Sequence, residues 1–109
     1  MKVDVKGHTT LIKNTAEGIA AFCEKVTHEH VQFATQNVII DLTHVKATLA
    51  EIKLFSTLSK THCKGKKSFV IVAHDLDYNA VPSQLHVVPS IQEAHDIIEM
   101  EEIERDLGF

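Results

Sequence analysis

The sequence predicts an α/β fold: a mixed, mostly parallel sheet of four to five strands with helices packed on it. Residues 38–42 and 68–73 are almost wholly apolar, which is typical of strands that are covered on both faces. Between them, apolar residues recur every three or four positions, as in amphipathic helices. Because strands that alternate with helices are joined by right-handed crossovers, we expect these strands to pair in parallel.

Size and composition fit one domain that spans residues 1–109, with 44% apolar residues for its core. The net charge of -4 makes nucleic acid an unlikely main partner, because phosphate binding favours a basic surface. No apolar run approaches the roughly 20 residues of a membrane span, and the first residues lack the apolar core of a secretory signal. We therefore expect a cytoplasmic protein without a membrane partner.

The first elements are two short strands and a helix. Residues 1–13 alternate weakly around Gly7, which predicts two strands or an interrupted hairpin. Asn14-Thr15-Ala16-Glu17 then matches a capping box, an acceptor three residues before a glutamate, and predicts the start of a helix. The apolar face of that helix comprises Ile19, Phe22, Cys23, Val26 and His30.

A second capping box, Thr48-Leu49-Ala50-Glu51, follows the strand at residues 38–42. We expect one helix from this cap to Gly65, a residue type that favours helix C-termini. Its apolar face comprises Leu49, Ile52, Phe55 and Leu58.

The last third of the chain predicts two more strands and a helix. Residues 68–73 form a buried strand, and the polar stretch 74–84 has room only for a turn or one short helical piece. Residues 85–88 form a last short strand before Ser90, which caps the final helix. The apolar stripe of that helix comprises Ile91, Ala94, Ile97, Ile98, Met100, Ile103 and Leu107, and Gly108 ends it.

Three segments, NVIIDLTHV, KSFVIVAH and LHVVPSIQEAHDII, together with this order of elements, resemble the STAS domain family. That family includes the anti-sigma factor antagonists and the cytoplasmic domains of sulfate transporters. The resemblance implies a STAS-like fold and a non-enzymatic regulatory module that uses no cofactor and binds a protein partner, such as an anti-sigma or kinase-like protein. In the family, a kinase phosphorylates a serine where the second helix begins, a position whose free amides and dipole suit a phosphate.

Thr48 is the hydroxyl nearest to that switch, but the Asp-Ser-Ser-Gly-like stretch of the family is replaced here by Thr48-Leu49-Ala50-Glu51-Ile52. A plain N-cap, worth roughly 1 kcal/mol, is the other explanation of Thr48. A phosphate on Thr48 would also face the charge of Glu51, so the sequence favours the cap over the switch.

The predicted partner-binding surface lies between the third strand and the second helix. Asp41 stands at the end of a strand, where α/β proteins bind ligands, although such a residue often bonds the amides of the following loop. The residues assigned to this surface are Asp41, Thr43, His44, Lys46, Thr48 and Lys53.

The tail EMEEIERDLGF is similar to that of short STAS-like chains that are sometimes labelled ribonuclease Z. The metallo-nucleases share a His-x-His-x-Asp-His motif, whereas His28-Glu29-His30 lacks the second half. We therefore expect such a nuclease to be a partner at most, and an accessory role in tRNA 3′ processing is one alternative. A small-ligand or nucleotide sensor that uses the amides of the second helix is another.

The eight histidines and two cysteines do not form a motif. A zinc site needs three or four converging ligands, so we expect no metal and histidines that are solvated or at helix ends. Cys23 and Cys63 are expected to be reduced, buried thiols.

The charges are segregated between two helices. Four lysines are spaced along the second helix: Lys46, Lys53, Lys60 and Lys64. The final helix is rich in acidic residues. Helix faces that are simply solvated would explain both charge clusters. A surface that binds a charged partner, or a homodimer in which a basic face meets an acidic one, would explain them as well.

Overall fold

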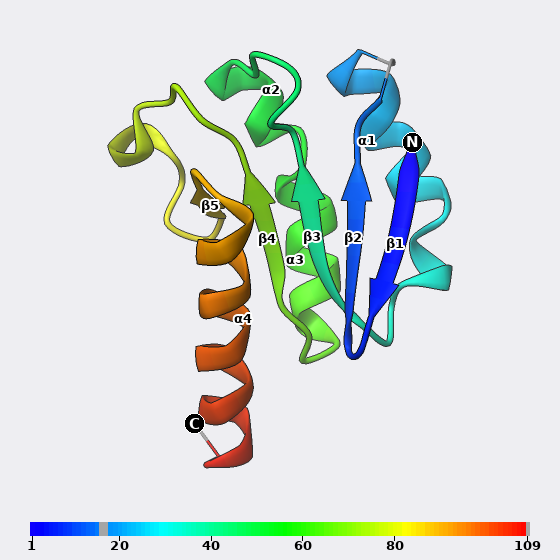
Figure 1. Cartoon of the computed structure of the whole chain (residues 1–109), viewed down its shortest axis with the longest axis vertical. Helices are drawn as coiled ribbons and strands as arrows, with labels where there is room; N and C mark the ends of the chain where they lie inside the picture. The colour runs from blue at the N-terminus through cyan, green and yellow to red at the C-terminus, as the bar shows by residue number, and fades with distance from the viewer. Residues whose placement is uncertain (16–17, 109) are drawn as a thin grey trace.

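The computed structural model describes residues 1–15 and 18–108, and its centre is a five-stranded sheet in the order β1-β2-β3-β4-β5 (Figure 1). The strands are β1 (Lys2–Lys6), β2 (Thr9–Lys13), β3 (Asn37–Asp41), β4 (Phe69–Val72) and β5 (His86–Val88). β1 is antiparallel to β2, and every other neighbouring pair is parallel. The α/β class and the mixed, mostly parallel sheet are therefore confirmed.

Helices cover both faces of this sheet. α1, α2 and α3 lie behind it in Figure 1, and α4 lies in front. The helices are α1 (Ile19–His28), α2 (Leu49–Lys53), α3 (Ser56–Lys64) and α4 (Ile91–Asp106), with 3-10 turns η1 (His30–Gln32) and η2 (Tyr78–Ala80). Among the residues that the structure describes, none of these helices combines the length and apolar character of a membrane span.

β3 and β4 are buried along their whole length because each of their faces packs against a helix layer. Ile40 and Ile71 point toward the layer of α1 to α3 and share a core with Phe22 and Phe55. The opposite face of these strands meets α4 in a smaller core of Ile39, Val70, Val72, Ala94 and Ile98. Burial on both sides is the physical reason why these strands are continuous apolar runs.

The first helix begins later than the capping box at Asn14 predicted. α1 starts at Ile19 with Gly18, which has no side chain to cap it, as its N-cap. Asn14 is buried at the end of β2, where its backbone N–H donates to the carbonyl of Asp41 at 3.2 Å. Glu17, the other half of the predicted box, lies outside the described residues.

The expected second helix is two helices, α2 and α3, joined at Leu54 and Phe55. The backbone at this junction stays right-handed but tightens, since Leu54 N–H donates to Glu51 and Phe55 N–H donates to Ile52, each three residues back. Both helices thereby bury their apolar residues, although the lysines predicted along one helix are divided between two segments.

Three predicted helix ends are confirmed. Thr48 and Glu51 form the capping box of α2, and the hydroxyl of Ser90 accepts the N–H of Glu93 at 3.2 Å. α3 ends at Lys64 with Gly65 as its C-cap, but Gly65 is right-handed and the left-handed residue is Lys66, with φ 62°.

Candidate functional site

Asp41 is the last residue of β3, and its carboxylate accepts hydrogen bonds from the loop that follows. Its Oδ1 accepts both the backbone N–H of Thr43 at 2.9 Å and the Thr43 hydroxyl at 2.7 Å. The residue is only 4% exposed. Asp41 therefore shapes the predicted surface from beneath and does not offer its carboxylate to a partner.

His74 extends this arrangement across the end of β4. Its Nε2–H donates to the carbonyl of Thr43 at 2.9 Å, and its Nδ1 lies 3.3 Å from Asp75 Oδ2. Both neighbours are hydrogen-bond acceptors, so His74 links the end of β4 to the loop after β3. The sequence analysis missed His74, although its place directly after a parallel strand was a signal, because the carboxyl ends of parallel strands share one edge.

Thr48 and Glu51 satisfy each other where α2 begins. Glu51 N–H donates to Thr48 Oγ1 at 3.2 Å, and Glu51 Oε1 accepts from the Thr48 backbone N–H at 3.0 Å and hydroxyl at 3.1 Å. Thr48 is thus the N-cap that the sequence favoured over a phosphorylation switch, and its hydroxyl contacts a carboxylate.

The remaining predicted surface residues lie on the loop after β3 and on α2. His44, Lys46, Thr48 and Lys53 are exposed, and Thr43 is half-buried. Leu54, directly after Lys53, is 49% exposed although Ile52 and Phe55 beside it are fully buried. An apolar side chain thus extends this polar surface, and the sequence analysis did not predict it.

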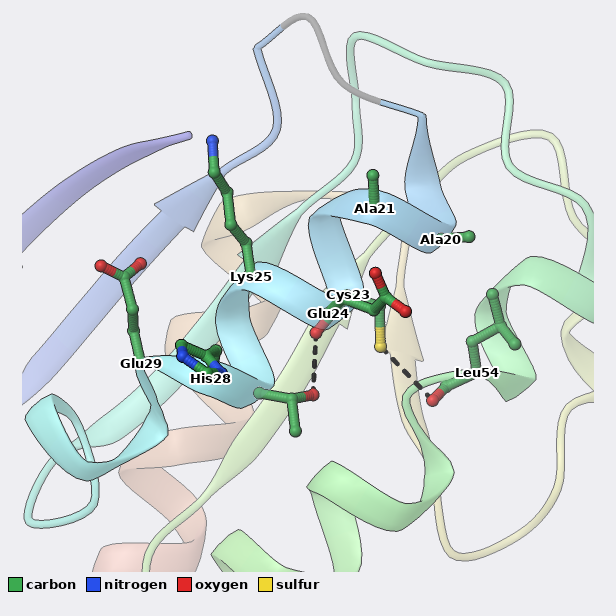
Figure 2. Close-up of a pocket in the computed structure, with 9 residues that line it drawn as sticks. Ala20, Ala21, Cys23, Glu24, Lys25, His28, Glu29 and Leu54 are labelled. Carbon is green, nitrogen blue, oxygen red and sulfur yellow. Dashed lines mark hydrogen bonds between the residues drawn. The ribbon is translucent and has the colours of Figure 1, made fainter.

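Leu54 borders an open groove of ≈ 1080 Å³ that runs along α1 (Figure 2). Its floor and walls include Ala20, Ala21 and Cys23, and its rim is charged and polar. The rim residues are Glu24, Lys25, Thr27, His28 and Glu29. Such a groove can receive an apolar side chain while its rim contacts polar groups.

Cys23 links α1, which lines the groove, to the junction of α2 and α3. Its thiol donates to the carbonyl of Leu54 at 3.4 Å, as Figure 2 shows. Burial raises the pKa of the Cys23 thiol above its usual range, and the nearby charge of Glu24 adds to this effect, while a hydrogen bond from Thr27 opposes it. The thiol is therefore kept protonated and structural rather than nucleophilic.

A second polar cluster lies at the opposite end of the sheet. His62 Nε2–H donates to the carbonyl of Gln36 at 2.7 Å, so its Nδ1 accepts from His30 Nε2–H at 2.8 Å. His62 is buried, and desolvation lowers its pKa below the ordinary 6.5; the Gln36 bond opposes this shift, and His30 and Lys67 reinforce it.

Two expectations about this region differ from the structure: the solvation of His62 and the burial of Cys63. His62 lies in the last turn of α3, as expected of a histidine at a helix end, but it is buried because α3 turns it into the core. Cys63, the next residue, faces solvent and is not the buried thiol that was expected. Within residues 1–15 and 18–108, no group of three or more histidine, cysteine, aspartate or glutamate side chains converges as metal ligands.

Comparison with known proteins adds no relative, since no protein-family model matches the chain and no curated protein matches it.

Proposed function

We propose that the chain is a non-catalytic, cytoplasmic interaction module whose partner protein docks on α2 and the groove between α1 and Leu54. The exposure of Leu54 is the observation that carries this proposal. Its isobutyl group stands at the rim of an open groove, on a helical turn whose other apolar residues are buried. Exposed apolar groups ringed by polar residues are typical of protein-binding sites.

The groups around Leu54 suit a protein ligand. Lys53 on α2 and Lys46 on the loop before it are exposed and provide cations on this surface, and His44 is exposed on the same loop. Such charges steer a partner with acidic groups toward the surface more than they hold it there. The resemblance of the sequence to STAS domains implies that the partner is an anti-sigma or kinase-like protein.

The proposal assigns Thr48 a structural part and not a regulatory one. A phosphate on its hydroxyl would remove the proton that this hydroxyl donates to Glu51 Oε1 and place about two negative charges against that carboxylate, 3.1 Å from the hydroxyl. α2 would lose this bond and gain repulsion at the same point. Glu51 therefore disfavours a phosphate on Thr48.

The test is capture of the partner from the lysate of the source cells with three tagged forms of the chain: native, Leu54→Asp and Val31→Asp. Val31 is the matched control because it is 83% exposed on η1 and is not among the residues that line the groove. We expect one protein to be captured by the native chain and by Val31→Asp, and not by Leu54→Asp. Equal recovery by all three forms would contradict the proposal, provided that circular dichroism shows each form folded.

The identity of the captured protein separates the alternatives. An anti-sigma or kinase-like protein supports the regulatory module, and a metallo-nuclease supports an accessory role in RNA processing. With the purified partner, calorimetry should show a dissociation constant raised about 30-fold or more in Leu54→Asp, the size expected for loss of a central apolar contact.

A further inference from the structure

α4 carries a charge opposite to that of the rest of the chain. It contains Glu93, Asp96, Glu99, Glu101, Glu102, Glu104 and Asp106. Arg105 is its only lysine or arginine, so the charge of α4 is 1 − 7 = −6. Since the whole chain has a net charge of −4, the other residues together have −4 − (−6) = +2. A partner that complements α4 must therefore be basic, and this chain itself provides basic surfaces.

α4 also has two apolar faces. Ala94 and Ile98 are buried against β3 and β4. Met100, Ile103 and Leu107 are 61%, 55% and 68% exposed. Their spacing of three and four residues puts them in one stripe, and at 100° per residue this stripe lies roughly opposite Ala94 and Ile98. The outer face of α4 is thus apolar, flanked by acids and turned away from its own sheet.

The sheet has an uncovered region on the same side as α4. Leu11 of β2 pairs with Ile39, which lies under α4, and with Asp4 of β1, so all three share this face. α4 packs along β3, β4 and β5, and the front of β1 and β2 is open in Figure 1. The register places the following residues on this open face: Lys2, Asp4, Lys6, Thr9, Leu11 and Lys13.

The dimensions of the open face suit one helix. Strands lie about 4.8 Å apart, so five strands span roughly 20 to 24 Å. A helix packs about 10 Å from its neighbour, so one face of such a sheet holds two helices side by side. α4 supplies one of them, and the face of β1 and β2 can accept the other.

We propose that two copies of the chain pair about a two-fold axis that runs along the strands, so that α4 of each copy lies on the β1–β2 face of the other. Each α4 is then packed between two sheets, with Ala94 and Ile98 on its own sheet. Met100, Ile103 and Leu107 contact the partner copy around Leu11 and the aliphatic stems of its lysines. The interface is isologous, because each copy gives one helix and receives one.

Charge complementarity favours this pairing over direct contact between two outer stripes of α4. The acids beside the stripe meet Lys2, Lys6 and Lys13 of the other copy, and these lysines offset the repulsion between the two neighbouring α4 helices; two stripes in direct contact would set acids against acids with no lysines between them. The surface assigned to the partner protein lies on α1 and α2, behind the sheet, and stays free in this dimer (Figure 1). The dimer therefore does not depend on the proposed function.

Sedimentation equilibrium over a series of protein concentrations tests the dimer. We expect the native chain to approach twice its mass of 12.2 kDa and to dissociate as salt is raised. Ile103→Asp, which changes an exposed side chain, should weaken association about 30-fold or more. The pair Lys6→Glu and Lys13→Glu on the sheet should weaken it at least about tenfold.

A charge swap makes the test specific. Glu99→Lys with Glu104→Lys should also dissociate the dimer, and the four substitutions in one chain should restore association. Lys60→Glu with Lys64→Glu on α3 is the matched control and should leave the mass unchanged. A native chain that stays monomeric would overturn the proposal. So would a dimer that stays intact in Ile103→Asp, in Glu99→Lys with Glu104→Lys, or in Lys6→Glu with Lys13→Glu. Circular dichroism confirms the fold of every variant.

Discussion

The two ends of the parallel sheet use polar side chains in opposite ways. At the carboxyl end, Asp41 bonds Thr43 two residues on, and Thr48 bonds Glu51 three residues on. At the amino end, Asn37 Oδ1 accepts from Ser68 N–H, 31 residues away, and from Arg105, 68 residues away. The first set closes loops, and a longer-range bond at that end, from His74 to the Thr43 carbonyl 31 residues away, is exposed. The second set joins separate elements inside the molecule.

The difference shows which end maintains the fold and which end is free to present a surface. Water competes for exposed hydrogen bonds, so each contributes little net free energy, whereas a buried polar group that loses its partner leaves a large desolvation cost. Substitutions at the amino end should therefore destabilise the chain. Those at the carboxyl end should change binding with less effect on stability.

The largest effect is expected for Asn37→Ala. This change leaves the buried N–H of Ser68 without its acceptor, and it removes one of the two acceptors of the half-buried Arg105 guanidinium, which keeps the Ser68 hydroxyl. We expect the free energy of unfolding to fall by about 2–3 kcal/mol in denaturant titrations. Asn79→Ala on exposed η2 is the control, and equal small losses in both variants would remove the contrast between the two ends.

The pH dependence of stability tests His62 at the same end. Because its pKa is lowered in the folded chain, the folded state binds fewer protons than the unfolded state near pH 6.5. The stabilisation is therefore present above pH 6.5 and is lost as pH falls through the folded pKa. Thermal melts should show this loss in the native chain and in the control His95→Gln, which changes an exposed histidine, and a smaller loss in His62→Gln. Equal pH slopes in all three would refute the assignment.

A smaller effect is expected at the carboxyl end for Thr48→Ala. The variant loses the N-cap of α2 and the reciprocal bond of Glu51. We expect a cost of about 1 kcal/mol in the free energy of unfolding, measured in denaturant. Thr57→Ala, at an exposed position of α3, should cost nothing and can add about a few tenths of a kcal/mol, because alanine has the higher helix propensity. A loss at Thr48 as large as that at Asn37 would mean that the two ends are equally important for the fold.

The smallest effect is a gain, expected for Lys66→Gly. Lys66 occupies the left-handed region with φ 62° after α3, where a side chain is strained and glycine is not. We expect a gain of about 0.5–1 kcal/mol, seen as a higher melting temperature. Lys67→Gly, beside it and without positive φ, should give no gain.

The sequence by itself determined the features that depend on neighbours along the chain. The apolar runs of β3 and β4, the capping box at Thr48 and the cap at Ser90 were all predicted, because burial on both faces and i to i+3 bonds leave local patterns. The predicted surface residues His44, Lys46 and Lys53 are exposed for the same local reason.

Only the tertiary structure decided the features that join distant elements. No pattern along the chain shows that α3 turns His62 toward Gln36, or that Arg105 reaches Asn37. The junction at Leu54 likewise depends on how α2 and α3 each fit against the sheet and on a carbonyl that Cys23 contacts from another helix. These contacts form only when packing brings the elements together, since their free energy arises from burial and not from sequence proximity.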